Sequence, residues 1–283
     1  ETSTTIKSGS IVSPELPIEF INTGELDIKT TYVLPVTIKS VEGIGVLQSA
    51  KTYYYVFRGA SLINVVCNIS RNRAYPDFKN DSKFNNLTEN TMEILFKANS
   101  FPNTLNTLMG IESNYLLRIG DATIPNNQLQ VATSVNNCTS ADLQLESGKW
   151  YHVAVAFNKG NVKVYINGVE KLSGSTGKSS VSLGAKHTNE EDGSRCFWVG
   201  YSYKDDRYFD GVVSEVRIWN RALTAEEIQA TNHFYTIEPE SEGLIAYWKF
   251  DEGSGTVAKD YSVSGYDLTI EKEPKWESVS LPQ

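Results

Sequence analysis

The clearest pattern along the chain is a strict alternation of apolar and polar positions over residues 150–168. The fully apolar face of the first strand in this stretch is made by Tyr151, Val153, Val155 and Phe157. After a polar tetrad the alternation resumes at 162–166, and Asn167-Gly168 supplies the positive φ angles that a type I′ turn requires. The pattern predicts a β-meander with one face buried against another sheet.

The same kind of reading predicts short strands along most of the chain. The further candidates are Leu62–Ile69, Met92–Ala98, Thr107–Ile111, Tyr115–Ile119, Gln128–Ala132 and Phe197–Tyr201. Loops rich in Asn, Ser and Pro separate many of them. One helix is indicated, at about 224–231, because Thr224 and Glu227 have the spacing of a capping box. Many short strands and a single helix predict an all-β sandwich.

Two stretches resemble a known family. Lys-Trp-Tyr-His-Val-Ala at 149–154, followed by Val-Tyr-Ile-Asn-Gly at 164–168, resembles the core of laminin-G-like domains, which are concanavalin A-like jelly rolls. Residues 209–224 are similar to the closing strand of that family and the short helix after it. The resemblance implies a jelly roll of two antiparallel sheets. It leaves the ligand open, because this fold hosts lectins, glycosidases and protein-binding modules.

Three parts are expected. Residues 1–57 form a small β-sandwich-like unit, possibly truncated, in which 32–36 and 52–57 resemble a domain of unknown function that precedes laminin-G-like domains in surface lipoproteins of Bacteroidetes. Residues 58–236 form the jelly roll. Residues 237–283 form a C-terminal extension that packs on the sandwich, because Tyr247, Trp248 and Trp276 need burial.

Composition excludes several classes of protein. A net charge of −8 over 283 residues argues against a nucleic-acid partner. No run of eighteen apolar residues is present, so we expect no membrane span in this chain. Cys67, Cys138 and Cys196 lie among mostly apolar or strand-like neighbours and are expected to be buried thiols. The chain begins at Glu1 without Met, and we expect a mature or trimmed fragment.

Motifs for catalysis are incomplete. Hydrolases with the concanavalin A-like fold use carboxylates spaced as Glu-x-Asp-x-x-Glu on one strand, and the nearest match, at 25–30, lacks the last Glu. The Ser-Thr-Gly-Lys-Ser run at 175–179 lacks the first glycine of a phosphate-binding loop. His152, on a strand of the meander, is expected to be a core or interface residue, and His187 and His233 have no ligand-like spacing to each other. Three scattered histidines give no triad order. We therefore expect no catalytic residue, no enzyme activity and no cofactor.

The candidate binding site is a loop that combines flat rings with charged groups. Such a mixture suits sugars, whose C–H faces stack on aromatic rings while their hydroxyls need planar donors and acceptors. The competing interpretation is a charged loop whose tyrosines pack on the sheet. Calcium is an alternative role for Asp205 and Asp206, since it prefers oxygen ligands. The candidate glycan-binding residues are Tyr201, Tyr203, Asp205, Asp206, Arg207 and Tyr208, with Asn114 and Tyr115 on a neighbouring loop.

The function expected from these observations is non-catalytic carbohydrate binding. By resemblance, the protein would capture oligo- or polysaccharides at a bacterial cell surface for a glycan-utilisation system. It would be extracellular or held at the outer membrane by a lipid anchor on a segment missing from this chain. Outer-membrane glycan importers are possible partners. Two alternatives stay open: a protein-binding adhesin, and an accessory lectin module of an endoglycosidase.

Overall fold

The computed structural model describes residues 3–18, 26, 30–58, 63–187 and 195–282. The chain divides into two compact units, Glu1–Ser61 and Leu62–Gln283. Each is described by itself. No helix among the described residues is long and apolar enough to cross a membrane.

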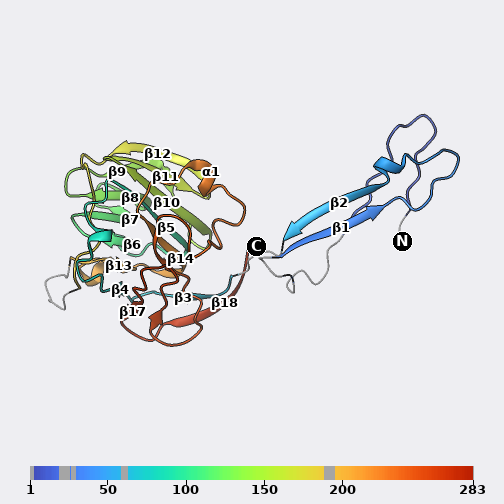
Figure 1. The fold of residues 1–283 in the computed structure, drawn as a ribbon. Coiled ribbons are helices and arrows are strands. Elements are labelled where there is room, and N and C mark those ends of the chain that lie inside the picture. The colour runs from blue at the N-terminus through green and yellow to red at the C-terminus, as the bar shows by residue number, and fades with distance from the viewer. Residues whose placement is uncertain (1–2, 19–25, 27–29, 59–62, 188–194, 283) are drawn as a thin grey trace. The chain divides into compact units, whose positions relative to one another are not determined.

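The described part of the first unit holds one antiparallel strand pair (Figure 1). Strand β1 (Thr31–Thr37) pairs with β2 (Thr52–Arg58), and a 3₁₀ helix, η2 (Gln48–Ala50), precedes β2. Many of its apolar side chains are exposed, Tyr53 by 71% and Val56 by 65%. The sandwich expected for residues 1–57 stays a prediction, because the described residues show only this pair.

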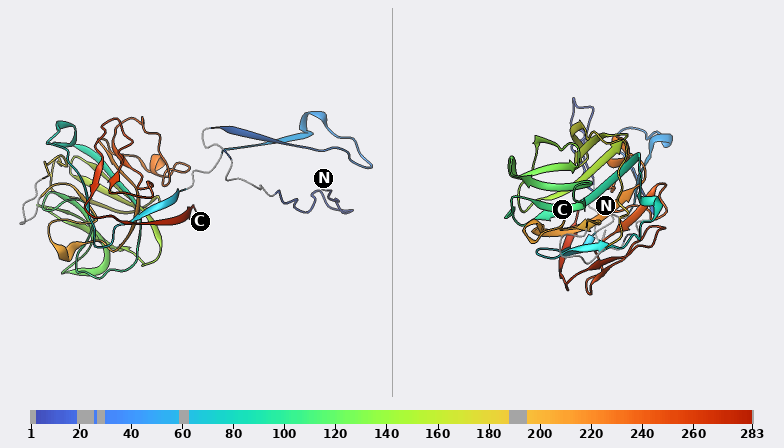
Figure 2. Two further views of the ribbon diagram at one scale, coloured as in Figure 1. Left: turned by 90° about the horizontal axis from the view of Figure 1, so that it is seen from below. Right: turned by 90° about the vertical axis from the view of Figure 1, so that its left-hand side faces the viewer.

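The second unit consists of two eight-stranded antiparallel sheets that stack face to face (Figures 1 and 2). Sheet I runs in the order β12 (Val169–Ser175), β11 (Asn161–Ile166), β10 (Trp150–Asn158), β5 (Glu89–Ala98), β14 (Gly211–Trp219), β3 (Ile63–Asn68) and β18 (Lys275–Leu281), and β15 (Leu244–Trp248) also pairs with β14. Sheet II runs in the order β16 (Val257–Ala258), β17 (Leu268–Ile270), β4 (Ala74–Pro76), β13 (Trp198–Val199), β6 (Asn106–Ile111), β7 (Tyr115–Asp121), β8 (Ile124–Thr133) and β9 (Cys138–Gln144). Three short helices lie outside the sheets: η3 (Ser82–Phe84), η4 (Asp205–Arg207) and α1 (Ala225–Ile228).

The main core lies between the sheets, as the alternation predicted. Val153, Val155 and Phe157 of β10 are fully buried there, and Tyr151 packs against them. At the β11–β12 hairpin Asn167 and Gly168 have φ angles of +48° and +76°, which confirms the predicted turn. The nearly all-β sandwich confirms the predicted fold class. All three cysteines are buried thiols, as expected.

Two elements are shorter than predicted. The strand expected at Phe197–Tyr201 forms ladder pairs only at β13, and the chain turns away at Gly200, which has a φ of +79°. A side chain at Gly200 would be strained by this φ and would meet the side chain of Ile69 at 3.1 Å, so the turn favours glycine. The helix ends at Ile228 rather than near Thr231, but its capping box is present as predicted.

The last strands of the chain belong to both sheets. Strand β15 pairs with β14 and β18 with β3 in sheet I, while β17 pairs with β4 in sheet II. Tyr247 and Trp248 are fully buried. Residues 244–281 are thus part of the hydrogen-bonded framework of the sandwich.

The outer face of sheet I carries a second apolar layer. Ala154, Tyr165 and Trp219 lie on this face. They pack against Leu223, which precedes α1, and against Ile228, the last residue of α1. The side-chain amide of Gln229 donates a hydrogen bond to the carbonyl of Gly168 at 2.8 Å and holds the helix over the hairpin. The segment that includes α1 and the residues after it therefore covers one outer face, as a lid of apolar side chains.

Candidate functional site

The predicted loop, residues 201–208, is a closed and braced connection between β13 and β14. The amide of Phe209 donates to the carbonyl of Gly200 at 2.9 Å, which brings the ends of the loop together. Helix η4 forms its middle. The side chain of Asn103 donates to the carbonyl of Tyr208 at 3.0 Å, so a second loop supports it. One backbone hydrogen bond and one side-chain hydrogen bond therefore fix the ends of the loop.

An aromatic cluster, made of Tyr75, Trp198, Tyr201 and Tyr208, lies at the base of this loop. Trp198 and Tyr201 contact edge to face with centroids 5.1 Å apart, and Tyr208 lies 4.9 Å from Tyr201. Trp198 and Tyr201 are buried, whereas Tyr75 and Tyr208 are half-buried. The imidazole of His187 stacks on one face of Tyr75 with ring centres 3.5 Å apart. The half-exposed ring of Tyr208 and the remaining face of Tyr75 are therefore the surfaces that this aromatic base can present.

Arg73 lies over this cluster. Its guanidinium carbon is 4.5 Å from the ring centre of Tyr201 and 5.1 Å from that of Trp198. Two of its nitrogens donate to the carboxylate of Glu271, at 2.8 and 2.5 Å. Burial raises the pKa of Tyr208 to about 12. The phenol is therefore neutral at physiological pH and can donate a hydrogen bond.

A second guanidinium and a third half-buried tyrosine occupy the other side of the loop. Arg207 pairs with Glu112 at 3.2 Å, and the distance from its Nη2 to the hydroxyl of Tyr203 is 3.2 Å. Its guanidinium carbon lies 4.5 Å from the ring centre of Tyr203. Lys204 and Arg195 also approach this ring, at 5.4 and 5.5 Å. Tyr203 is thus an electron-rich ring that cations surround.

The outer face of sheet II continues from Trp198 across the neighbouring strands. In register beside Trp198 lie Gly110, Leu116 and Ala132, which form a smooth apolar row. A parallel polar row is formed by Thr107, Arg118, Gln130 and Thr139. Within it Arg118 donates to Gln130 at 2.8 Å and pairs with Asp121 at 2.5 Å. Arg118 and Gln130 are buried, so these groups mainly satisfy one another beside the aromatic cluster.

Two predicted site residues are buried where their side chains cannot contact a ligand, and a third has its side-chain amide already engaged. Tyr115 is fully buried in the main core, 5.8 Å from Phe157, because it alternates with core residues along β7. Tyr201 is 5% exposed beneath the cluster. The amide of Asn114 is engaged, since it donates to Ser182 at 2.6 Å and accepts from Lys178 at 2.8 Å. Tyr115 and Tyr201 are therefore not available to a ligand, whereas a role for Asn114 stays a prediction.

The other predicted residues are brought together at the surface. Tyr203, Arg207 and Tyr208 are half-buried, and Asp205 and Asp206 are exposed on η4. The side chain of Asp206 is 77% exposed, and its carboxylate is 3.9 Å from Arg207. Neither aspartate belongs to a group of three close ligand atoms among the described residues. A calcium role for them stays a prediction, and the carboxylate motif at 25–30 lies largely outside the described residues.

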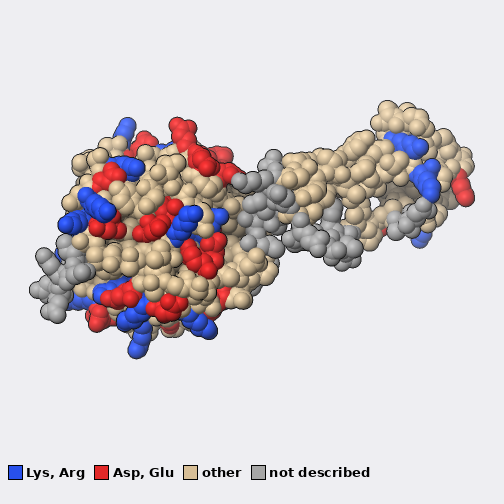
Figure 3. All heavy atoms as spheres, turned by 60° about the horizontal axis from the view of Figure 1, so that its bottom comes forward, with Lys and Arg blue, Asp and Glu red and all other residues tan. Residues whose placement is uncertain are grey.

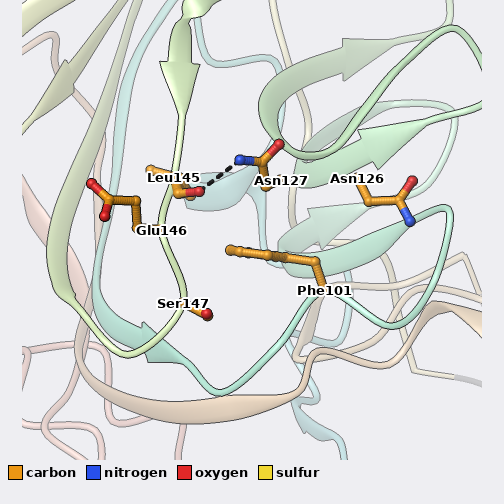
Figure 4. Close-up of a pocket in the computed structure, with 6 residues that line it drawn as sticks. All are labelled: Phe101, Asn126, Asn127, Leu145, Glu146 and Ser147. Atoms are coloured by element: carbon orange, nitrogen blue, oxygen red, sulfur yellow. Dashed lines mark hydrogen bonds between the residues drawn. The ribbon is translucent and has the colours of Figure 1, made fainter.

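A shallow hollow of about 550 Å³ lies near the start of β8 (Figure 4). Its lining consists of Phe101, Asn126, Asn127, Leu145, Glu146 and Ser147. Figure 4 shows the Phe101 ring edge-on between Asn127 and Ser147, with the Glu146 carboxylate turned away. The hollow combines one flat apolar ring with amide and hydroxyl groups.

The group closest to a metal site is Glu93, His152 and His233, whose ligand atoms lie within 4.8 Å of one another. Glu93 and His152 are buried on the outer face of sheet I, and the buried His233 reaches them from the segment after α1. His233 Nε2 is 2.6 Å and His152 Nε2 3.4 Å from Glu93 Oε1, the latter in poor hydrogen-bond geometry. Trp219 donates to the other oxygen of Glu93 at 2.7 Å.

The surroundings of this trio do not suit a divalent ion. Arg217, which is fully buried, has a nitrogen 3.7 Å from Glu93 and is hydrogen-bonded to Glu215. A guanidinium so close already neutralises the carboxylates and would repel a cation. Glu93, His152, Glu215, Arg217 and His233 are therefore better described as a buried polar network that holds the covering segment.

Residues 72–229 match the family model of the concanavalin A-like lectin/glucanases superfamily. The chain belongs to this superfamily. No curated protein sequence matches it. Among solved structures, a candidate carbohydrate-binding protein from Bacteroides ovatus is 27% identical, with a TM-score of 0.70 over 90% of this chain and 70% of that one.

Two other members of the fold are less similar to this lectin/glucanase-like chain. A heptameric pentraxin from Limulus polyphemus is 15% identical, with a TM-score of 0.42 over 60% of this chain and 82% of that one. Domain 4 of an extracellular arabinanase from Geobacillus stearothermophilus, solved with arabinotriose, is 19% identical, with a TM-score of 0.44 over 74% and 89%.

Sequence reasoning missed several residues of the site. Arg73, Tyr75 and Glu112 lie about 90 or more positions before the loop, and only the pairing of β4, β13 and β6 brings them to it. Trp198 was assigned to a strand and not to the site. No spacing in the sequence links these residues. Phe101 lies in a loop with Pro102 and Asn103, a pattern that predicts a turn and gives no sign of a site.

Proposed function

We propose that this protein binds carbohydrates without catalysis, through the surface formed by the 201–208 loop and the aromatic cluster. The observation that carries the proposal is the set of three half-buried tyrosine rings, Tyr75, Tyr203 and Tyr208, beside two guanidinium groups already fixed by carboxylates. Rings with fixed polar neighbours match the two kinds of surface that a sugar presents. The name of the Bacteroides ovatus structure, which is 27% identical, supports the same class of ligand.

The expected affinity follows from the size of these contacts. A tyrosine ring that stacks on a pyranose contributes on the order of 1–2 kcal/mol from buried apolar area. A hydrogen bond from a charged group to a hydroxyl contributes a similar amount after desolvation. Two or three such contacts correspond to dissociation constants from millimolar to micromolar, or roughly 4–8 kcal/mol.

The absence of catalysis is proposed from the state of the nearby carboxylates. Glu112 and Glu271 each accept hydrogen bonds from an arginine, Arg207 and Arg73. A carboxylate held in this way is an acceptor and is not placed to protonate a glycosidic oxygen. Asp205 and Asp206 point from an exposed turn. Binding and orientation of the sugar are the roles this arrangement supports.

The setting we propose is a bacterial surface, where the protein would capture oligo- or polysaccharides for importers of the outer membrane. A lipid anchor on a segment outside this chain would hold it there. The only support for this setting is the family resemblance and the source of the 27% identical structure. No cofactor is part of the proposal.

A protein-binding role is the second candidate, and the first unit favours it. Side chains alternate between the two faces of the β1–β2 pair. The register places four large side chains on one of these faces: Leu34, Val36, Tyr53 and Tyr55. Tyr53 is 71% exposed, and Val56 on the other face is 65% exposed. Large exposed apolar groups of this kind mark protein interfaces. An adhesin would use this surface and leave the tyrosines of the second unit unoccupied.

A glycan array with the purified chain tests the main proposal, followed by calorimetric titration of the best oligosaccharide. Tyr203→Ala and Tyr208→Ala should each weaken binding about tenfold, which corresponds to about 1.4 kcal/mol. Tyr261→Ala is the matched control, because Tyr261 is also half-buried and lies near two lysines, Lys249 and Lys259. If both site variants bind with wild-type affinity, the proposed site is refuted. If the chain binds no glycan on the array, the proposed function is refuted.

A further inference from the structure

The hollow around Phe101 lies on loops apart from the 201–208 loop, and the proposed function does not use it. Phe101 follows β5 and is half-buried, with part of its ring packed against the main core. The rest of the ring faces the hollow. The volume of the hollow, about 550 Å³, falls within the usual range of ligand sites, and a half-exposed aromatic ring forms part of its wall.

The ring is fixed in place before any ligand arrives. The amide of Asn99 donates to the carbonyl of Asp210 at 2.9 Å, and Ser100 donates to the Asp210 carboxylate at 2.5 Å. Asn103 donates to Tyr208 at 3.0 Å on the other side of Phe101. Because both flanks are anchored, binding would not incur the entropy cost of ordering this loop.

The opposite wall is also rigid and offers unused polar groups. The side chain of Asn127 donates to the carbonyl of Leu145 at 2.8 Å, and the amide of Leu145 donates to the Asn127 carbonyl at 2.9 Å. This leaves the side-chain oxygen of Asn127 as an acceptor. Asn126 and Ser147 are exposed and add an amide and a hydroxyl. Amide and hydroxyl groups can serve both as donors and as acceptors for sugar hydroxyls.

The charge of the hollow indicates which sugars it suits. Glu146 is the only charged residue in its lining, and its carboxylate is held by Lys149 at 2.7 Å. Figure 4 shows this carboxylate directed away from Phe101. No lining side chain is a cation that would attract a carboxylate or sulfate on a sugar. A neutral sugar needs none, since ring stacking and amide hydrogen bonds suffice.

We propose that the Phe101 hollow is a second carbohydrate site, selective for neutral sugars, that acts together with the 201–208 surface. The proposal rests on the carbohydrate binding proposed above. The hydrogen bond from Asn103 to Tyr208 joins the loop of one site to the loop of the other. A polysaccharide that engages both sites gains avidity, because the second contact forms at a high effective concentration. A short oligosaccharide occupies the two sites independently.

Nuclear magnetic resonance distinguishes the two sites without a change of ligand. The ¹⁵N-labelled chain is titrated with the neutral oligosaccharide that scores best on the array, and the side-chain amide signals of Asn126 and Asn127 report the hollow. These signals should shift and saturate in the wild type. The Tyr203→Ala/Tyr208→Ala variant should keep this shift, since the hollow is a separate site. An acidic oligosaccharide of equal length should need at least a tenfold higher concentration to shift these amide signals to the same extent.

Two substitutions of Phe101 separate stacking from folding. Phe101→Leu keeps an apolar group against the core but has no flat face, so the Asn126 and Asn127 shifts should need at least tenfold more ligand. Phe101→Trp keeps a flat face and should bind within about threefold of wild type. Melting temperatures of both variants identify any loss that comes from misfolding.

The outcomes separate the failure of this inference from the failure of the proposed function. If Phe101→Leu binds like wild type, or if the Asn126 and Asn127 signals never move while those around Tyr203 do, the second site is refuted and the function stands. Tighter binding of the acidic oligosaccharide at the hollow refutes its selectivity. If no carbohydrate shifts any signal, both proposals are refuted.

Discussion

The buried polar network on sheet I and the 201–208 surface on sheet II contain the same kinds of residues in different settings. In the network Arg217 and Glu93 are completely buried, and the guanidinium lies 3.7 Å from the carboxylate. At the 201–208 surface Arg207 and Glu112 form a similar pair at 3.2 Å, but both side chains keep about a seventh of their surface exposed. Chemistry alone therefore does not distinguish a structural cluster from a binding surface.

What differs is the segment that covers each cluster. Residues after α1 lie over the network, where Phe234 stacks on His152 with ring centres 4.5 Å apart and His233 contacts Glu93. Over the described residues of the 201–208 surface, the rings of Tyr203 and Tyr208 stay half-exposed. A cluster whose groups satisfy one another under a lid stabilises the fold. A cluster whose rings stay half-exposed can bind a ligand. On the face of the second unit that Figure 3 shows, acidic and basic side chains are interspersed.

The largest effect should come from Arg217→Met. The substitution leaves Glu93 and Glu215 buried without their cation, which costs about 3–5 kcal/mol of unfolding free energy when one partner of a buried pair is removed. Urea denaturation followed by tryptophan fluorescence measures this loss. Lys163→Met is the control, because its pair with Glu170 is exposed and is worth about 0–1 kcal/mol. Equal losses in the two variants would contradict a structural role for the network.

A smaller effect with a definite pH window is expected for His152. Burial lowers its pKa below 6.5, so the unfolded chain takes up a proton there more readily than the folded one. The stabilisation from a neutral buried His152 is complete above pH 6.5 and is lost as the pH falls below it. Glu93 acts in the same direction at lower pH: burial opposes ionisation, but the two imidazoles lower its pKa well below 4.5.

Urea denaturation at pH 7.5, 6.5 and 5.5 tests this for the wild type and for His152→Gln. The wild type should lose stability between pH 6.5 and 5.5 more steeply than the variant. Burial raises the pKa of Glu215, which makes the folded state bind a proton first and gives the opposite slope in both proteins. Only the difference between the two curves therefore reports His152. Parallel curves would mean that His152 does not titrate differently in the two states.

The contrast between the two regions also shows how far the sequence could predict this structure. Alternation placed Val153 and Val155 in the core, because a strand puts every second side chain on one face. The same alternation could have placed Tyr115 in the core with Leu117 and Ile119, instead of at the site. It could not reveal that His152, on the opposite face, is also buried, because its cover comes from residues about 80 positions later.

The binding surface was only half predictable for the same reason. Tyr203, Arg207 and Tyr208 lie within six consecutive positions, so a local mixture of rings and charges is enough to find them. Tyr201 follows Gly200, where the positive φ ends the strand and makes the direction of the next side chain unreadable from alternation. Arg73 reaches the cluster through the pairing of β4 with β13 in sheet II, and short strands give no pattern from which a partner follows.

A third prediction concerns the start of the covering segment. The hydroxyl of Thr224 accepts a hydrogen bond from the amide of Glu227 at 3.3 Å, and the Glu227 carboxylate accepts one from the amide of Thr224 at 2.9 Å. Thr224→Ala removes half of this capping box and should cost about 1 kcal/mol. Thr231→Ala, at an exposed turn, should cost less than half of that. Melting curves of the two variants decide whether the cap holds the cover in place.

The smallest change in stability, and the most informative for function, is expected from Arg207→Gln. Its pair with Glu112 is partly exposed, so its loss should cost no more than about 1 kcal/mol of unfolding free energy. Sugar binding should nevertheless fall about tenfold, because the guanidinium positions Tyr203 through a contact of 3.2 Å to the hydroxyl and 4.5 Å to the ring centre. Titration calorimetry and urea denaturation on the same preparation measure both quantities. If Arg207→Gln instead loses several kcal/mol of stability and keeps its affinity, the 201–208 surface resembles the buried network in role, and the sugar site must lie elsewhere on the sandwich.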